Sequence, residues 1–180
     1  ACMLRVRDLI MRDADALAAS ECTNTGIPLK QLRQLHMPGA AHHFQFYAEV
    51  ASQLKGELHQ QRSGYQLQVS REPVGVAALI SPWNGPVNMS CAKIAAALAF
   101  GNSCVLKPSE YTPLAFVRLM EILREAGIPD GVVNMVNGRG AVTGAALASH
   151  PDIDLVSFTG GSGSGPLVNA AAARNLKRTT

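Results

Sequence analysis

The sequence predicts an α/β protein: a Rossmann-like parallel sheet with flanking helices, preceded by N-terminal helices and a β-hairpin. After residue 73, apolar β-rich runs recur at intervals of roughly 20 to 30 residues, the length of a strand and its crossover helix. Each run is followed by a segment with helical periodicity. Short apolar strands that alternate with helices are typical of a parallel sheet covered on both faces.

The first 57 residues are predicted to be N-terminal helices. Residues 4–21 place Val6, Leu9, Ile10 and Leu17 on one helical face, and Gly26 is a plausible cap after them. A second helix is expected from about residue 39 to 54, directly after a proline. The chain begins without a capping residue, which leads us to expect a fragment of a longer protein.

Residues 58–72 have a different pattern and predict a hairpin. Tyr65, Leu67 and Val69 alternate with polar residues, and Arg62–Ser63–Gly64 is the expected turn. Because an isolated two-stranded ribbon is marginally stable in water, it should pack on another surface, and a partner subunit is one candidate.

The third region, residues 73–180, carries the expected sheet. Strands are expected at 74–80, 103–107, 131–136 and 154–159. Helices are expected at 88–101, 113–127, 141–150 and 166–176. Ligands of open parallel sheets bind beyond the carboxyl ends of the strands, so the loops at these ends are the candidate site.

Composition limits the classes of partner. Of 180 residues, 47% are apolar and 16% are charged, which indicates a globular chain. The net charge of +3 is spread without a basic block, so no nucleic acid or membrane is expected as a partner. With no signal peptide, no apolar run long enough to span a membrane and no CxxC among the four cysteines, a cytoplasmic location is expected.

The loop "TGGSGSG" (159–165) joins a predicted strand to a predicted helix. Glycines there would let the backbone approach a phosphate, and a helix N-terminus offers free N–H groups. A flexible turn explains the same residues equally well. The loop does not have the spacing of a nucleoside triphosphatase P-loop.

The loop "KPSE" places Lys107 and Glu110 after the second strand. An acidic residue at this place can accept hydrogen bonds from a ribose diol, as in NAD sites, and would repel the 2′-phosphate of NADP. The other interpretation is a helix entry in which Ser109 is the cap. From this motif alone, the helix entry is favoured.

The loop "PWNGP" places Trp83 and Asn84 between two prolines. An asparagine amide held in a rigid loop is a suitable donor to a developing oxyanion. A turn asparagine beside a packing tryptophan is the simpler interpretation of the motif alone.

Together these segments resemble the aldehyde dehydrogenase superfamily. "REPVGVAALISPWN", "VLKPSE", "GVVNMVNGRG" and "SHPDIDLVSFTGG" occur in order at the spacing of that family, over essentially the whole chain. The chain is similar to the cofactor domain, with the oligomerisation ribbon of the family at the hairpin. Members oxidise an aldehyde to an acid with NAD or NADP: a cysteine thiolate attacks the carbonyl and hydride passes to the nicotinamide.

The resemblance implies a role for each loop. Asn84 would be the catalytic oxyanion donor. The expected cofactor-binding residues are Ile80, Ser81, Pro82, Trp83, Lys107, Ser109, Glu110, Gly138, Phe158, Thr159, Gly160 and Gly161. NAD is the expected cofactor, with NADP as the alternative. The family also implies a homo-oligomer, a dimer or tetramer, that acts on a small aldehyde.

The chain departs from the family pattern at two positions. Gly85 stands where the family commonly has a bulky residue, which would widen that part of the site. The glycine-rich loop beginning at Thr159 replaces "FTGS" followed by an acidic residue, and is similar to branches that act on semialdehydes such as hydroxymuconic semialdehyde.

The catalytic residues of the family are also missing from this sequence. No "ELGGK" segment with its general base and no nucleophile motif is present. Cys91 and Cys104 are expected to be inert buried thiols, so this chain alone should not oxidise aldehydes. The histidines His36, His42 and His43 lack metal spacing, and no metal is expected.

The alternative function is a non-catalytic module that binds a nucleotide or oligomerises through the hairpin. Another Rossmann-type reductase is disfavoured because the sequence has no YxxxK pair.

Overall fold

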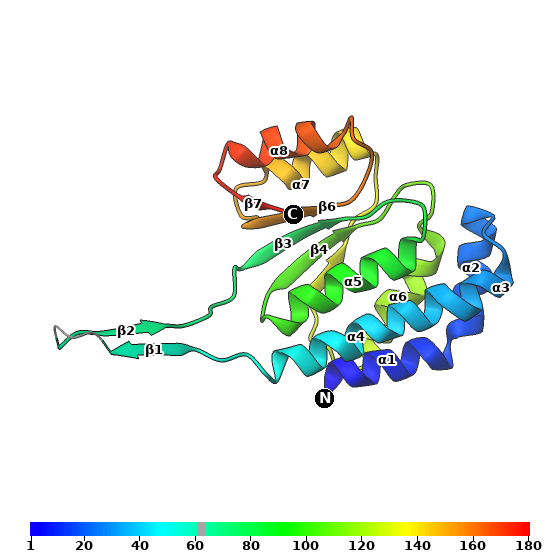
Figure 1. The fold of residues 1–180 in the computed structure, drawn as a ribbon. Helices are drawn as coiled ribbons and strands as arrows, with labels where there is room; N and C mark the ends of the chain where they lie inside the picture. The colour runs from blue at the N-terminus through cyan, green and yellow to red at the C-terminus, as the bar shows by residue number, and fades with distance from the viewer. Residues whose placement is uncertain (61–63) are drawn as a thin grey trace.

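A five-stranded parallel sheet forms the centre of the computed structural model, which describes residues 1–60 and 64–180 (Figure 1). The strand order is β5–β4–β3–β6–β7. The strands are β3 (Val76–Ile80), β4 (Ser103–Lys107), β5 (Val133–Met135), β6 (Leu155–Phe158) and β7 (Arg178–Thr179). The predicted fold class is confirmed. The sequence pattern did not predict β7, because its two residues are polar and exposed.

Helices cover both faces of this sheet (Figure 1). One face carries α5 (Pro86–Ala99) and α6 (Leu114–Glu125). The other carries α7 (Ala145–Ser149), which continues from the π-helical turn η2 (Gly140–Gly144), and α8 (Gly165–Ala173). The chain crosses from one face to the other between β5 and β6, so the strand order reverses beside β3.

The larger hydrophobic core lies on the α5 side of the sheet. Leu79 and Leu106 from the strands pack with Ile94, Phe116 and Phe44, all nearly or completely buried. Burial of each such side chain contributes about 1.5 to 3 kcal/mol. A smaller cluster around Ile80 and Val156 attaches α8 to the opposite face. The core is therefore thick on one side of the sheet and thin on the other.

The N-terminal region differs from its prediction. The single helix expected over residues 4–21 is wrong: α1 (Cys2–Arg12) and α2 (Ala14–Thr25) meet at Asp13, whose φ of −98° and ψ of 12° interrupt the helix. The Asp13 carboxylate accepts hydrogen bonds from Arg12 and from Arg118 of α6, and these contacts favour a break over a continuous helix. The predicted cap at Gly26 is confirmed, with φ of 72°.

The second predicted helix also begins earlier than expected. Continuous helical structure runs through α3 (Leu29–Gln31), the π-helical turn η1 (Leu32–His36) and α4 (Met37–Ala51). The expected start near residue 39 is wrong because Pro38 lies inside this structure. Proline has no N–H and its ring crowds the carbonyl four residues earlier, and the wider turn of η1 before it accommodates both effects.

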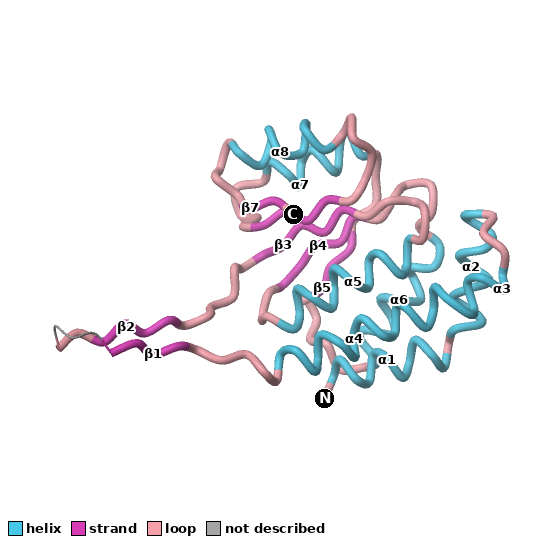
Figure 2. The backbone as a smooth tube through the Cα atoms, in the orientation of Figure 1, coloured by secondary structure: helices cyan, strands magenta, loops and turns pink. Residues whose placement is uncertain are grey.

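The predicted hairpin is confirmed as β1 (Glu57–Gln60) and β2 (Gln66–Val69). The strands are antiparallel, with Glu57 opposite Val69. Arg62 and Ser63 of the expected turn lie outside the described residues. Figure 2 shows the hairpin extending away from the sheet, and every residue of both strands is exposed. Its role in oligomerisation stays a prediction, as do the domain boundaries at residues 57 and 72.

Within residues 1–60 and 64–180, every helix is too short or too polar to cross a bilayer.

The Asp13 contacts lead to a stability prediction. The hydrogen bond from Arg12 and those from Arg118 lower the pKa of Asp13 to about 2, below its ordinary value of 3.8. A carboxylate with a depressed pKa stabilises the fold above the ordinary pKa and loses this effect as the pH falls toward the lower value. Asp13→Ala should therefore cost about 1 to 2 kcal/mol at neutral pH, since both arginines are partly solvent-screened.

Thermal or urea unfolding at pH 7 and pH 3 measures this cost. The difference between the wild type and Asp13→Ala should shrink at the lower pH. Asp15→Ala is the matched control, because Asp15 is exposed and its ion pair is with Arg33, on the surface. Equal destabilisation by both variants would contradict the assignment.

Candidate functional site

The parallel register brings three strand ends to one level. Ile80 at the end of β3 pairs with Lys107 of β4 on one side and with Phe158 of β6 on the other. The ladder continues past the strands, since Ser81 N–H donates to the Lys107 carbonyl (3.1 Å) and Thr159 N–H donates to the Ile80 carbonyl (3.0 Å). The loops that follow therefore leave the sheet side by side, where the strand order reverses.

These loops surround a crevice of about 480 Å³. All but one of the thirteen predicted site residues line it: Ile80, Ser81, Pro82, Trp83, Asn84, Lys107, Ser109, Glu110, Phe158, Thr159, Gly160 and Gly161. Gly140 and Ser164 also line it and were not predicted. The structure thus brings together loops that were identified separately, whereas their roles in binding stay predictions.

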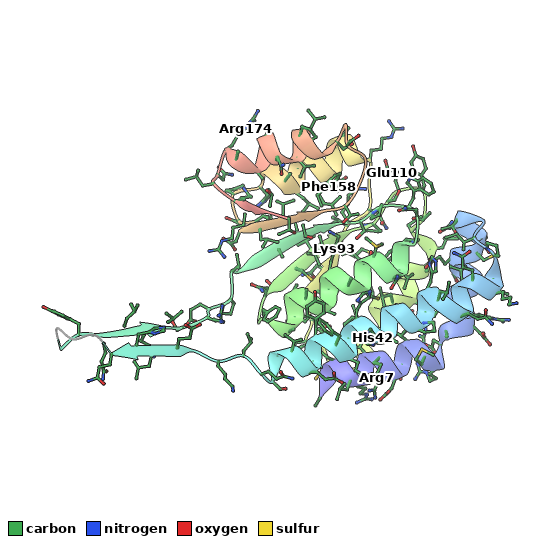
Figure 3. All side chains as sticks on the ribbon, in the orientation of Figure 1. Arg7, His42, Lys93, Glu110, Phe158 and Arg174 are labelled. Carbon is green, nitrogen blue, oxygen red and sulfur yellow. The ribbon has the colours of Figure 1, made fainter. Side chains whose placement is uncertain are left out.

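A buried cation and a carboxylate form one wall of the crevice. Lys107 is only 2% exposed, and its Nζ donates to the Pro108 carbonyl (2.9 Å) and to Glu110 Oε2 (3.1 Å). The other carboxylate oxygen, Oε1, accepts the Gly140 N–H at 3.2 Å. Figure 3 shows Glu110 among the loops at the strand ends. The pair ties the loop after β4 to η2.

The same contacts keep Glu110 ionised. Hydrogen bonding to its own backbone N–H, then to Lys107 and to Gly140, lowers the pKa of Glu110 below its ordinary value. A carboxylate has about four acceptor positions, so hydroxyl groups of a ligand can still be bound.

Ser109 is 7% exposed and accepts the Tyr111 N–H at 3.3 Å, a turn within the loop. The predicted helix cap at Ser109 is wrong, because α6 begins only at Leu114, whose N–H donates to Oδ1 of Asn24.

The loop between β3 and α5 presents an indole and an amide. Trp83 is 60% exposed and Asn84 is also exposed, and both line the crevice. Gly85 follows with φ of +110°, and Pro86 begins α5. A Cβ built on Gly85 would lie 3.3 Å from Cε1 of His36. The predicted widening of the site at Gly85 is therefore partly offset, because the imidazole of His36 lies where a side chain at this position would project.

The glycine loop after β6 packs closely on an aromatic ring. A Cβ on Gly160 would collide with the ring of Phe158, so the loop lies against that ring (Figure 3 labels Phe158). Ser164 and Gly165 donate their N–H groups to the Gly161 carbonyl, and the next residue is a proline without an N–H. The glycines of the loop are therefore better placed as donors than the first turn of α8.

A second, apolar pocket of about 310 Å³ adjoins the crevice and was missed by the sequence reasoning. It lies between η2–α7 and α8. It shares Ile80, Gly140, Phe158 and Ser164 with the crevice, and is completed by Ala141, Gly144, Ala145, Leu167, Val168 and Ala171. The only sequence signal was the small size of the residues on both helices, which also fits simple helix packing.

Gly138 does not line the crevice. Its φ is +150°, and a Cβ there would collide with Oγ1 of Thr143. Thr143 N–H donates to the Arg139 carbonyl at 2.8 Å within the first turn of η2. Gly138 therefore permits the tight entry into η2, whose Gly140 borders both pockets.

Two of the cysteines are deeply buried. Burial raises the pKa of Cys104 to about 12. Burial also raises the pKa of Cys91, with a contribution from the charge of Glu21. None of the four cysteines lines the crevice. Within the described part of the chain, no three His, Cys, Asp or Glu side chains gather as a metal site would require.

Comparison with known proteins gives consistent results. The family model described as "Aldehyde dehydrogenase family" matches residues 1–180. The NADP/NAD-dependent aldehyde dehydrogenase PuuC of Escherichia coli is 43% identical over 175 residues, covering 97% of this chain and 35% of PuuC. The 5-carboxymethyl-2-hydroxymuconate semialdehyde dehydrogenase of Escherichia coli is 44% identical over 163 residues, covering 91% and 35%.

Solved structures agree with these relatives. PnpE of Pseudomonas sp. WBC-3 has a TM-score of 0.95 and 39% identity, and the match covers 99% of this chain and 37% of PnpE. PnpE has also been solved in complex with nicotinamide adenine dinucleotide. The chain thus spans about a third of the length of the proteins it matches.

The geometry at Gly138 predicts a selective effect of adding one methyl group. Gly138→Ala should lower the melting temperature by several degrees. The new Cβ must displace Thr143, and alanine must adopt a backbone conformation that is strained for a residue with a side chain. Gly140→Ala is the control two residues away, since a Cβ there has open space and ordinary φ. Circular dichroism melting of both variants measures the effect, and equal melting temperatures would contradict it.

Proposed function

This chain belongs to the aldehyde dehydrogenase family, and from that premise we propose that the whole protein oxidises an aldehyde to a carboxylic acid with NAD. In this proposal the chain supplies the cofactor site and the oxyanion donor. The observation that carries it is the convergence of Asn84, the Lys107–Glu110 pair and the glycine loop on one crevice.

The residues present fit a dinucleotide. Lys107 and Glu110 offer a cation and an ionised carboxylate to a ribose diol. The glycine loop offers backbone N–H groups to a pyrophosphate, at the strand-order reversal where dinucleotides bind in such sheets. The adjoining apolar pocket suits a planar base, and its shared wall at Gly140 and Phe158 makes it continuous with the crevice. Bound NAD would supply a two-electron acceptor for the hydrogen on the aldehyde carbon.

The same wall favours NAD over NADP in this proposal. A 2′-phosphate on the adenosine ribose would approach Glu110, whose pKa is lowered by its hydrogen bonds and which is therefore ionised at neutral pH. Lys107 offsets part of that charge, but its Nζ is already used by Glu110 and by Pro108. Like charges at short range disfavour binding.

Asn84 would act on the substrate oxygen. As a nucleophile adds to the carbonyl, negative charge develops on that oxygen, and an amide N–H placed beforehand stabilises it without reorganisation. The short connection between β3 and α5, with prolines at 82 and 86, restricts the Asn84 backbone. Restriction of this kind is what an oxyanion donor requires.

We expect the nucleophile and the general base to come from parts of the protein outside these 180 residues. Cys91 and Cys104 are buried with raised pKa values, which keeps them as neutral thiols. The two other cysteines, Cys2 and Cys22, do not line the crevice. The chain alone should therefore bind the cofactor without oxidising aldehyde.

The hairpin is proposed to pair subunits. Val69, His59 and Leu67 share one face of the ribbon, and both faces are exposed. A homo-oligomer, a dimer or a tetramer, would cover Val69 and Leu67, the apolar side chains of this face.

The experiment that tests the function is aldehyde-dependent formation of reduced nicotinamide by the full-length protein. Semialdehydes of aromatic degradation are the first substrates to test, since one relative is named for such a compound. Cofactor binding without turnover by the full-length protein would favour the non-catalytic module instead.

Asn84→Ala should lower kcat by about 100- to 1000-fold, as expected when one oxyanion donor is removed. The KM for NAD should change little, because the amide acts on the substrate oxygen. Steady-state kinetics measure both values. A variant with unchanged kcat would show that Asn84 is only a turn residue.

Glu110→Gln should shift the cofactor preference toward NADP. Loss of the charge removes the repulsion of a 2′-phosphate and weakens the hydrogen bonds to the ribose diol, so the ratio of kcat/KM for NAD to that for NADP should fall about tenfold. Glu121→Gln, an exposed site on α6, is the control. An unchanged ratio in Glu110→Gln would place the ribose elsewhere.

A further inference from the structure

Glu21 is a buried carboxylate that the mechanism above does not use. It lies in α2 and is 1% exposed, which makes it the one buried acidic residue in the described part of the chain. Burial raises the pKa of Glu21, while the N–H of Val87 and the neighbouring His36 oppose that shift. A buried charge is costly, and an apolar side chain at such a position is often as stable or more so. Packing alone therefore does not explain it.

The partners of Glu21 lie at the start of α5. Oε2 accepts the N–H of Val87, 66 residues later in the chain, at 3.3 Å. The residue before α5 is Gly85, which has no side chain to cap the helix. The carboxylate of α2 thus caps α5 from another element and meets the positive end of its dipole.

His36 of η1 also lies at the start of α5, between Glu21 and Gly85. Its Nδ1 lies 3.3 Å from Glu21 Oε1, and its Cε1 lies where a side chain at residue 85 would project. The imidazole therefore fills the space beside the turn at Gly85. Cys91 of α5 is the other titratable group whose pKa reflects the charge of Glu21, and burial keeps its thiol neutral.

We propose that Glu21 and His36 are positioning residues for Asn84, which they hold through the turn at Gly85 and the first turn of α5. Asn84 directly precedes Gly85, so movement of the helix start moves its amide. A displacement of about 1 Å at a reacting group can cost about 100-fold in rate. The inference rests on the proposed function, because it concerns how the oxyanion donor of that function is held.

Glu21→Leu separates positioning from packing. Leucine has a similar size and keeps the packing, but the Val87 N–H and His36 lose their acceptor, so the melting temperature should fall by a few degrees while the protein stays folded. The helix cap is lost, and kcat should fall about 10- to 100-fold with an unchanged KM for NAD. Glu21→Gln keeps an oxygen acceptor for the Val87 N–H and should retain most of kcat. Glu49→Leu, on the exposed face of α4, is the matched control and should match the wild type.

His36 provides a second, independent variant in case Glu21→Leu fails to fold. His36→Ala removes the imidazole that lies beside Gly85 and contacts Glu21, and should lower kcat in the same way. His36→Asn can still offer an N–H to Glu21 and should restore part of the rate.

The emission of Trp83 gives a readout without turnover. Trp83 lies in the loop that Glu21 and His36 hold, and is the chain's only tryptophan. Its spectrum in the cofactor-free full-length protein, obtained by subtraction of the matching Trp83→Phe variant, should shift in Glu21→Leu and His36→Ala but not in Glu49→Leu.

These outcomes separate the two ideas. An inactive wild-type protein would refute the proposed function, and unchanged Trp83 emission in Glu21→Leu and His36→Ala would then also overturn the inference. An active wild type with folded Glu21→Leu and His36→Ala variants of normal kcat and normal Trp83 emission would overturn the inference. Loss of NAD affinity together with kcat would also overturn it, because the effect would not be specific to Asn84.

Discussion

The site depends first on the register of three parallel strands. Because Ile80, Lys107 and Phe158 stand opposite one another, each loop leaves the sheet at the same height. A shift of one residue in any strand would turn these side chains to the opposite face. The backbone hydrogen bonds of Ser81 and Thr159 extend the register beyond the strands. The register of the sheet therefore determines where the loops lie, and the loops in turn form the crevice.

The two faces of the sheet hold different parts of this crevice. On the thin side, Glu110 links the loop after β4 to Gly140 of η2, so one hydrogen bond joins the proposed diol site to the wall of the apolar pocket. On the thick side, Glu21 and His36 fix the start of α5 beneath the Asn84 loop. Changes to the proposed cofactor wall and to the proposed oxyanion wall can thus be made separately, which makes their kinetic effects distinguishable.

The sequence predicted features that depend on local pattern and missed those that depend on distant contacts. The strands, the hairpin and the site loops could be predicted because their signals, apolar runs and the positions of glycine and proline, lie within a few neighbouring residues. The helix break at Asp13 depends on Arg118, 105 residues away, and the cap of α5 depends on Glu21, so no window could show either. The early start of α3 was missed because a proline within a helix needs the unusual turn of η1. The motif that contains Lys107 and Glu110 favoured a helix entry when it was considered alone. Only its combination with the other loops indicated a ribose-binding pair.

Gly85 shows how a local departure from a family pattern changes its meaning in three dimensions. From the sequence, a glycine in place of a bulky residue indicates empty space. In the structure, the φ of +110° strains any residue with a side chain, and the direction of that side chain is filled by His36. The space that a side chain at residue 85 would fill is thus occupied by the imidazole of His36, which also contacts the buried carboxylate of Glu21. The position therefore affects how the Asn84 loop is held more directly than how large a substrate it admits, and a larger residue at 85 would disturb the loop before it narrowed the site.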